Sequence, residues 1–461
     1  MPRQSLRSLI SRLALTATLA ADLQEHGFPT AGLPAEPAPP PAQSHPAEDI
    51  LPAVACPAGK GSLLDAADMD AARTAWQYFV ATRQETTGFF SSVRGYPFAT
   101  VWDLGSGLAG LVAAGQLGLI EPASFHRDAV RYLSTLQDMP LYQGELPNRE
   151  YQTQSGRMVD LKERLSAEGS GWSALDIGRL LLWLRLTAIW YPDLGPQIEK
   201  VVKRFDFTRL AAGGEMHGAL RGESGESLNQ EGRLGYEQYA AAGYALWGVS
   251  LPRARGGEET ALTTLYGLRV PHDTRGNAHL TSEPFLLAGL ELGGIDATFR
   301  GLTDTLYAVQ KRRWQGTQAL TAVSEDTLDR APWFAYNSVL VDDKPWQCQS
   351  PDGRDAAELR TLSTKAAFGW AVLYRDDYGR RLRQAAAPLV HPRFGFYAGR
   401  YESGAANTSL NVNTNAVILE AILFLKRGGR PFLAPETPLG PCSAPYVFGR
   451  GRAEERSGDM R

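Results

Sequence analysis

The stretch that decides the fold reads WDLGSGLAGLVAAGQLGLI at residues 102–120. It begins with a polar, glycine-rich head, and its remainder is apolar on every side of a helix. A helix of this kind is buried inside a large domain, because none of its faces suits water. The stretch therefore predicts an inner helix that carries its polar groups at one end.

Five other stretches repeat this form, each with a head rich in Gly, Ser or Asn, a polar group and a strongly apolar helix. They occupy residues 172–190, 235–248, 282–294, 363–374 and 413–425. Ser282, Ser363 and Asn413 are residue types that cap helix N-termini. The sequence thus predicts six buried helices of one design.

More amphipathic segments alternate with these six helices. We assign them to residues 69–82, 122–136, 196–205, 260–268, 298–312 and 375–386. Alternating buried and half-exposed helices do not suit a four-helix bundle, but they do suit an inner ring of helices covered by an outer ring. Strand signals are weak. We therefore predict an all-α (α/α)6 toroid of about twelve helices, with loop insertions, over residues 63–440.

The two ends of the chain differ from this domain in composition. Residues 1–21 are basic at first and then briefly apolar with small residues, which indicates a signal peptide. This apolar run is shorter than the roughly 18 residues that span a membrane. Residues 22–62 form a Pro/Ala-rich linker, and residues 441–461 a polar tail that we expect to be flexible. We expect a periplasmic or secreted bacterial protein.

The whole composition excludes several classes of function. A net charge of −3 offers no basic surface for nucleic acid. The sequence has no HExxH motif or i,i+4 pair of histidines, no GxSxG elbow and no GxGxxG that follows a predicted strand, so we expect no metal and no cofactor. In an oxidising compartment Cys348 and Cys442 are candidates for a disulfide, since both lie in loops that contain Pro and Gly.

The polar groups at the helix heads are mostly carboxylates, and aromatic residues make up 10% of the chain. Glycosidic bond cleavage needs one carboxylic acid as proton donor and one carboxylate as base or nucleophile. Burial can keep the donor protonated near neutral pH. We therefore predict four catalytic candidates, with Glu237 or Asp176 as general acid and Glu231 or Asp103 as base.

Other residues near these heads are predicted to bind substrate. They are Trp102, Trp172, Arg179, Arg233, Tyr236, Glu283, Trp333, Trp346 and Glu402. Structural interpretations remain open beside the functional ones. Asp176 with Arg179, and Arg233 with Glu237, have the spacing of intrahelical ion pairs. Asp103 could simply cap its helix, and tryptophans often pack in a core.

Several long motifs resemble one family. They are TTGFFSS (86–92), LPNREYQTQSGRMVD (146–160), GWSALDIGRLLLWL (171–184), EGRLGYEQYAAAGYALWG (231–248), STKAAFGW (363–370) and NTNAVILEAI (413–422), together with the stretch at 96–120. In this order, over residues 71–428, they resemble an exported bacterial family, domain of unknown function 3131, regarded as glucoamylase-like. The resemblance implies a relative of (α/α)6 glycoside hydrolases, including bacterial enzymes that act on β-1,2-glucans, and a link to exopolysaccharide genes. It implies no catalytic assignment.

We therefore predict an exported glycoside hydrolase that cleaves or remodels a bacterial polysaccharide, such as a β-1,2-glucan or an exopolysaccharide. Two alternatives remain. A non-catalytic accessory protein for polysaccharide binding or export would keep its binding when the carboxylates are lost. A toroidal polysaccharide lyase would use His217, Tyr236 and Arg233 around a uronic acid.

Overall fold

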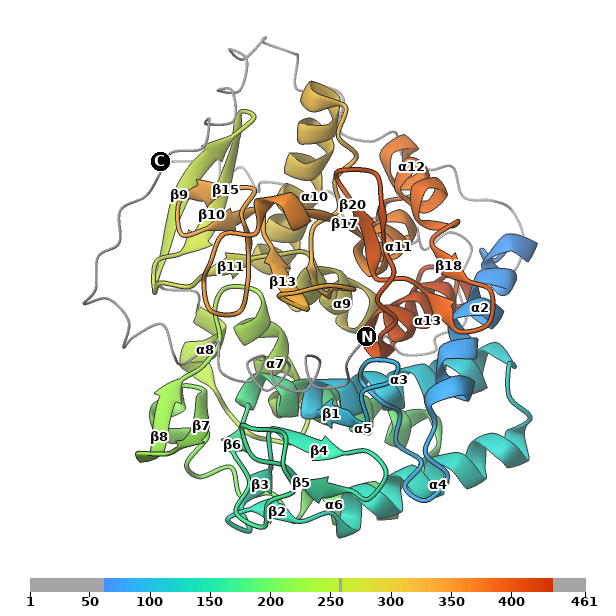
Figure 1. Cartoon of the computed structure of the whole chain (residues 1–461), viewed down its shortest axis with the longest axis vertical. Helices are drawn as coiled ribbons and strands as arrows, with labels where there is room; N and C mark the ends of the chain where they lie inside the picture. The colour runs from blue at the N-terminus through green and yellow to red at the C-terminus, as the bar shows by residue number, and fades with distance from the viewer. Residues whose placement is uncertain (1–61, 257–258, 434–461) are drawn as a thin grey trace, which may run out of the picture.

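The computed structural model describes residues 62–256 and 259–433 (Figure 1). Within them, six apolar helices pack side by side in a ring, and the last packs against the first. They are α3 (Val101–Leu117), α5 (Ala174–Trp190), α7 (Tyr236–Ala245), α9 (Glu283–Leu292), α11 (Thr364–Tyr374) and α13 (Val412–Lys426). All six predicted inner helices are confirmed.

An outer layer of helices covers this ring. It consists of α2 (Ala66–Thr82), α4 (Pro122–Asp138), α6 (Gly195–Val202), α8 (Pro252–Gly256), α10 (Ala297–Thr317) and α12 (Asp377–Ala386). The longer outer helices are amphipathic. In α4, for example, Phe125, Ala129, Leu133 and Leu136 form one buried stripe. The (α/α)6 arrangement of the helices therefore matches the prediction.

One predicted outer helix is wrong. Residues 260–268 belong to a hairpin of two antiparallel strands, β9 (Thr260–Leu265) and β10 (Leu268–Asp273). Tyr266 and Gly267 between the strands have φ of 49° and 76°, as in the left-handed two-residue turns that fit hairpins. Alternation of exposed and half-buried residues, with β-branched threonines, favours a strand here. The short helix α8 takes the outer position instead.

The expectation of an all-α protein also needs correction, because the described residues contain eight small antiparallel sheets. Several of their strands lead directly into inner helices. Examples are β1 (Phe98–Thr100) before α3, β6 (Gly171–Trp172) before α5 and β17 (Thr361–Ser363) before α11. Strands of two or three residues are too short for a hydrophobic alternation to show in a sequence.

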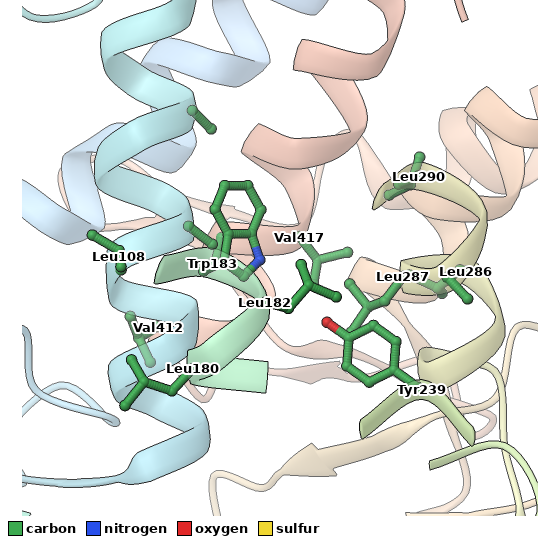
Figure 2. Packing of buried hydrophobic residues seen from close by; sticks show 14 of the residues in the cluster. Leu108, Leu180, Leu182, Trp183, Tyr239, Leu286, Leu287, Leu290, Val412 and Val417 are labelled. Carbon is green, nitrogen blue, oxygen red and sulfur yellow. The ribbon is translucent and has the colours of Figure 1, made fainter. Parts of the chain in front are cut away.

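The inner helices pack through large apolar side chains and a few close backbone contacts. Figure 2 shows Leu182, Trp183 and Val417 among the apolar side chains of the core that the inner helices share. A Cβ atom on Gly243 would lie 2.1 Å from the carbonyl oxygen of Gly178. Glycine at this position therefore allows α5 and α7 to approach closely.

A polar group closes the centre of the ring. Arg179 on α5 donates hydrogen bonds to Ser106 (2.9 Å) and Tyr239 (2.9 Å), and it pairs with Glu291 (3.2 Å) and Glu420 (2.9 Å). We call these five residues the central hub. Burial and the neighbouring Glu291 carboxylate raise the pKa of Glu420 well above its usual value, although Arg179 opposes them. One proton on Glu420 leaves the hub without net charge.

This position corrects the interpretation of Arg179. Its side chain is 0% exposed, so it does not bind substrate in this structure. It also pairs with residues of other helices rather than with Asp176, as the ion-pair interpretation had it. Arg179 holds the inner helices together.

The predicted signal peptide, most of the linker and the C-terminal tail lie outside the described residues. Cys348 is buried without a disulfide to another described residue, and Cys442 lies outside them. Among the described helices, none combines the length and apolar character needed to cross a membrane.

Candidate functional site

The inner helices begin at one end of the ring, which we call the helix-head end. Side chains from four heads form a continuous chain there. Ser106 on α3 donates to Asn413 on α13 (2.9 Å), which donates to Glu283 on α9 (2.7 Å). Glu283 in turn accepts a hydrogen bond from Lys365 on α11. Residues up to 307 positions apart are therefore brought to one place.

Asp103 stands in the first turn of α3 and is half-buried. Its Oδ2 accepts hydrogen bonds from the backbone N–H (3.0 Å) and hydroxyl (2.9 Å) of Thr100, so the capping interpretation is correct. Burial, with a smaller contribution from Glu283, raises the pKa of Asp103 to about 6, although Thr100 and Lys365 oppose the shift. One half-exposed carboxyl is thus both a cap and a titratable group near neutral pH.

Asp176 occupies the matching position in α5 and is also half-buried. Ser173 Oγ donates to its Oδ1 (3.0 Å). Burial first, and then the Glu231 carboxylate, raise the pKa of Asp176 to about 7, against Arg149 and Ser173. Asp103 adds to this increase, which places the two aspartates within electrostatic reach of each other.

Glu231 is buried and near enough to Asp176 to raise the pKa of that carboxyl. One of its oxygens accepts the backbone N–H of Ala174 at the start of α5, and the other pairs with Arg149 at 3.3 Å. A carboxylate in this position is stabilised by the helix dipole. Both oxygens are therefore engaged in anchoring the head of α5.

Glu237 is buried and engaged in a similar way. Arg275 pairs with it at 2.6 Å, and Gln230 donates to it at 3.0 Å. Burial raises its pKa. The expected partner Arg233 instead donates to the backbone carbonyls of Gly232 (2.7 Å) and Gly276 (2.9 Å). Glu237 and Arg233 thus hold loops together. Their polar atoms are engaged within the protein, so neither side chain is free to contact a substrate.

The predicted aromatic residues fall into two groups. Trp102, which precedes Asp103 in the chain, and Tyr236 are half-buried, with ring centroids 5.4 Å apart, and the buried Tyr236 hydroxyl has no hydrogen-bond partner within the described residues. Trp172 and Trp346 are buried and pack in the core, where the Trp172 indole donates to His217 O at 3.0 Å. Trp333 is half-buried in a loop.

The two remaining acidic candidates differ in exposure. Glu283 is fully buried within the chain of helix heads and pairs with Lys365. Glu402 is exposed and pairs with Arg313 at 2.8 Å and Arg360 at 3.6 Å. Both carboxylates are paired with cations, and their contact with a substrate stays a prediction.

Sequence reasoning missed Glu150, Asp326, Lys365 and Asn413 at this end of the ring. Burial raises the pKa of Glu150 to about 8, although Tyr96 Oη donates to it at 3.0 Å. Glu150, Lys365 and Asn413 lie in the quoted motifs, so a polar residue in a motif beside a buried helix was an available signal. Asp326 lies on the three-residue strand β12 (Glu325–Thr327), and no pattern marks it.

In residues 62–256 and 259–433, no three or more His, Cys, Asp or Glu side chains form a group that could hold a metal ion. A separate loop hollow, about 280 Å³ in volume, is lined by residues that include Ala331, Asp352, Arg354 and Glu358. It contains none of the helix-head residues.

Glu231→Gln is expected to lower the free energy of unfolding by about 2 kcal/mol, because buried Arg149 loses its charged partner. Urea unfolding monitored by circular dichroism measures this loss. A variant that is as stable as the wild type but inactive would instead make Glu231 a catalytic residue.

The fold and the family can be compared with known proteins. The model of the protein family of unknown function DUF3131 matches residues 70–428, and the chain belongs to this family. A search of curated proteins finds no match.

Several solved structures share the fold. A protein from Bacteroides fragilis assigned as a glucoamylase is 13% identical, with a TM-score of 0.61 over 81% of this chain and 94% of its own. An endo-β-1,2-glucanase from Chitinophaga pinensis, in complex with sophorotriose and glucose, is 11% identical, with a TM-score of 0.57 over 79% and 93%. A mutant endo-β-1,2-glucanase from Talaromyces funiculosus, in complex with β-1,2-glucan, is 13% identical, with a TM-score of 0.51 over 78% and 84%.

Proposed function

We propose that this member of the DUF3131 family is a glycoside hydrolase that cleaves a β-glucan, with β-1,2-glucan as the first candidate. The observation that carries the proposal is the pair of half-buried aspartates, Asp103 and Asp176, at neighbouring helix heads. Their raised pKa values suit proton transfer near neutral pH. We choose β-1,2-glucan as the substrate because two of the similar solved structures are endo-β-1,2-glucanases.

In the proposed reaction Asp176 is the general acid, since its carboxyl has the higher pKa of the two. It donates its proton to the glycosidic oxygen as the bond from that oxygen to the anomeric carbon breaks. Asp103 is the general base and takes a proton from the water whose oxygen bonds to the anomeric carbon. One water molecule is consumed, and two sugar hydroxyl ends are formed.

Trp102 and Tyr236 would bind the sugar beside these carboxyls. An indole and a phenol in edge-to-face contact offer apolar surface for the C–H face of a pyranose. This also accounts for a half-exposed Trp next to a catalytic candidate.

The pH profile of kcat/KM is expected to be bell-shaped, with its maximum between about pH 6 and 7. Activity should increase as Asp103 loses its proton near pH 6 and decrease as Asp176 loses its proton near pH 7. Asp103→Asn should remove the increase in kcat/KM on the acidic side of the profile. Initial rates from pH 4 to about 9 measure the profile. A flat profile across this range would contradict the assignment.

The proposal is tested by incubating the protein with β-1,2-glucan, α-glucans, cellulose and the exopolysaccharide of the bacterium that produces the protein. We expect new reducing ends from at least one β-glucan, without ultraviolet absorbance. Products that absorb ultraviolet light through a new conjugated double bond would indicate a lyase reaction. Arg233 argues against that alternative, because its donors are engaged with backbone carbonyls. Binding without any release would indicate the accessory protein.

We also propose that the protein acts outside the cytoplasm, where polysaccharide is found, because residues 1–21 have the composition of an export signal. Fractionation of the producing bacterium should place it in the periplasm or the medium. Recovery in the cytoplasm alone would contradict this.

A further inference from the structure

The described residues form one main hydrophobic core and a small second cluster that includes Cys348 and Tyr401. Most of the described aromatic residues belong to these two clusters. Those that lie outside both are Tyr96, Phe98, Tyr236, Trp333, Phe334 and Tyr336. Large aromatic side chains stabilise a fold chiefly by being buried in its core, so aromatic residues that the core does not use need another explanation.

These aromatic residues gather at the helix-head end. Tyr96 and Phe98 precede α3, with ring centroids 4.9 Å apart, and Tyr236 is the first residue of α7. Trp333 directly precedes β13 (Phe334–Asn337), which pairs with β12. The segment before α3 and the strand β13 are far apart in the sequence, so the fold has to bring them to the same end of the ring.

Asn411 joins the sheet of β13 to the segment in front of α3. It caps the head of α13, and its Nδ2 donates a hydrogen bond to Thr327 Oγ1 on β12 at 2.9 Å. Its backbone pairs with Val93, which also pairs with Tyr96. The sheet of β13 is therefore a neighbour of the segment that leads to Asp103 at the head of α3.

The sheet of β12, β13 and β16 (Cys348–Gln349) has a buried face and an outward face. Residues directly opposite each other in antiparallel strands point to the same side. The inward positions are buried, and they are Asp326, Ala335, Asn337 and Cys348. The outward positions are half-buried, and they are Glu325, Thr327, Phe334, Tyr336 and Gln349. We call these five outward side chains the β13 face.

The aromatic rings of the β13 face are held in place by their neighbours. Phe334 meets Tyr336 at 81° with ring centroids 5.1 Å apart, and His279 on β11 (His279–Leu280) stacks on Tyr336 at 4.4 Å. Burial lowers the pKa of His279 to about 4, so this ring is uncharged near neutral pH. An aromatic surface that is already fixed loses little conformational entropy when a ligand binds.

We propose that the β13 face binds a neutral sugar unit of the polysaccharide away from the bond that is cleaved, an inference that rests on the proposed function. The C–H face of a pyranose packs on aromatic rings, and its hydroxyls need polar partners such as Glu325 and Gln349. Glu325 is the charged member of the face, and its carboxyl disfavours a phosphate or an acidic sugar. The substrate is therefore an extended neutral chain that reaches from Trp102 to the β13 face.

Phe334→Leu is expected to raise the KM for β-1,2-glucan roughly tenfold without changing kcat, because a sugar unit that takes no part in the reaction contributes to binding alone. The shortest oligosaccharide that the wild type cleaves does not reach the β13 face, so its KM should stay the same. Phe334→Trp keeps an aromatic surface and should keep the wild-type KM on both substrates. Initial rates on linear β-1,2-gluco-oligosaccharides of increasing length measure these effects.

Ile189→Ala is the matched control. Ile189 is an apolar side chain, 48% exposed, in the last turn of α5, at the opposite end of the ring from the helix heads. This variant should keep every wild-type KM. Calorimetry gives a readout without cleavage, since adding Phe334→Leu to Asp176→Asn should weaken binding of a long oligosaccharide roughly tenfold. The Tm of Phe334→Leu should be that of the wild type, because Phe334 lies outside both hydrophobic clusters.

An unchanged KM for the glucan in Phe334→Leu, with a wild type that cleaves it, would overturn this inference and leave the proposed function in place. Equal increases in KM for short and long substrates, or a decrease in Tm that accounts for the weaker binding, would also overturn it, since both indicate a structural role. If the wild type cleaves no polysaccharide and Asp176→Asn binds none, the proposed function fails and this inference fails with it.

Discussion

Asp176→Asn is expected to lower kcat/KM for the glucan by roughly three orders of magnitude, the middle of the range that a general acid contributes. The amide cannot donate the proton that the leaving oxygen needs. The fold should survive, since the cap of α5 uses the backbone N–H of residue 176 on Ser173 Oγ, which the substitution leaves in place. Reducing-end assays and a thermal melt measure the two expectations.

The role of Asp176 as proton donor has a sharper test. A glucoside with a nitrophenol leaving group needs little protonation, so Asp176→Asn should lose much less activity on it than on the glucan. Asp304→Asn, a carboxyl away from the helix heads, should keep wild-type activity on both substrates. Equal losses on both substrates would remove Asp176 from the role of acid.

Arg179→Met is expected to lower the free energy of unfolding by about 3–5 kcal/mol, because it leaves the buried Glu291 carboxylate without its cation. Arg179 is the only cation in the central hub, where it pairs with Glu291 and Glu420. Urea unfolding measures the loss. A stability within error of the wild type would contradict the account of the hub.

Glu420→Gln is the matched comparison, and it should lower the free energy of unfolding by less than about 1 kcal/mol. The raised pKa of Glu420 means that the native side chain already carries a proton, and the amide reproduces its shape and neutrality. If both variants are equally destabilised, Glu420 is ionised in the folded protein.

The sequence was sufficient for the helical ring because each inner helix is apolar on all sides, a local property that tertiary contacts do not override. The heads of α3 and α5 were equally readable, since Thr100 with Asp103 and Ser173 with Asp176 are local capping pairs. Because each pair places its aspartate in the first turn of an inner helix, both aspartates lie at the helix-head end of the ring. Their catalytic role stays a prediction.

The ion-pair partners of the other candidate residues could not be predicted from the sequence. Glu237 pairs with Arg275 rather than Arg233, and Arg179 pairs with Glu291 and Glu420, residues 112 and 241 positions away. Such pairs depend on how distant segments meet, which spacing along one helix does not indicate. The same limit hid Asp326 on a three-residue strand, and it left the burial of Trp172 undecided.

The most direct test of the central claim is a crystal structure of Asp176→Asn with a bound β-1,2-gluco-oligosaccharide. The account predicts a glycosidic oxygen within hydrogen-bonding distance of the residue 176 side chain and a sugar ring against Trp102. An oligosaccharide seated in the loop hollow beside Asp352 and Arg354, with the helix heads empty, would contradict it.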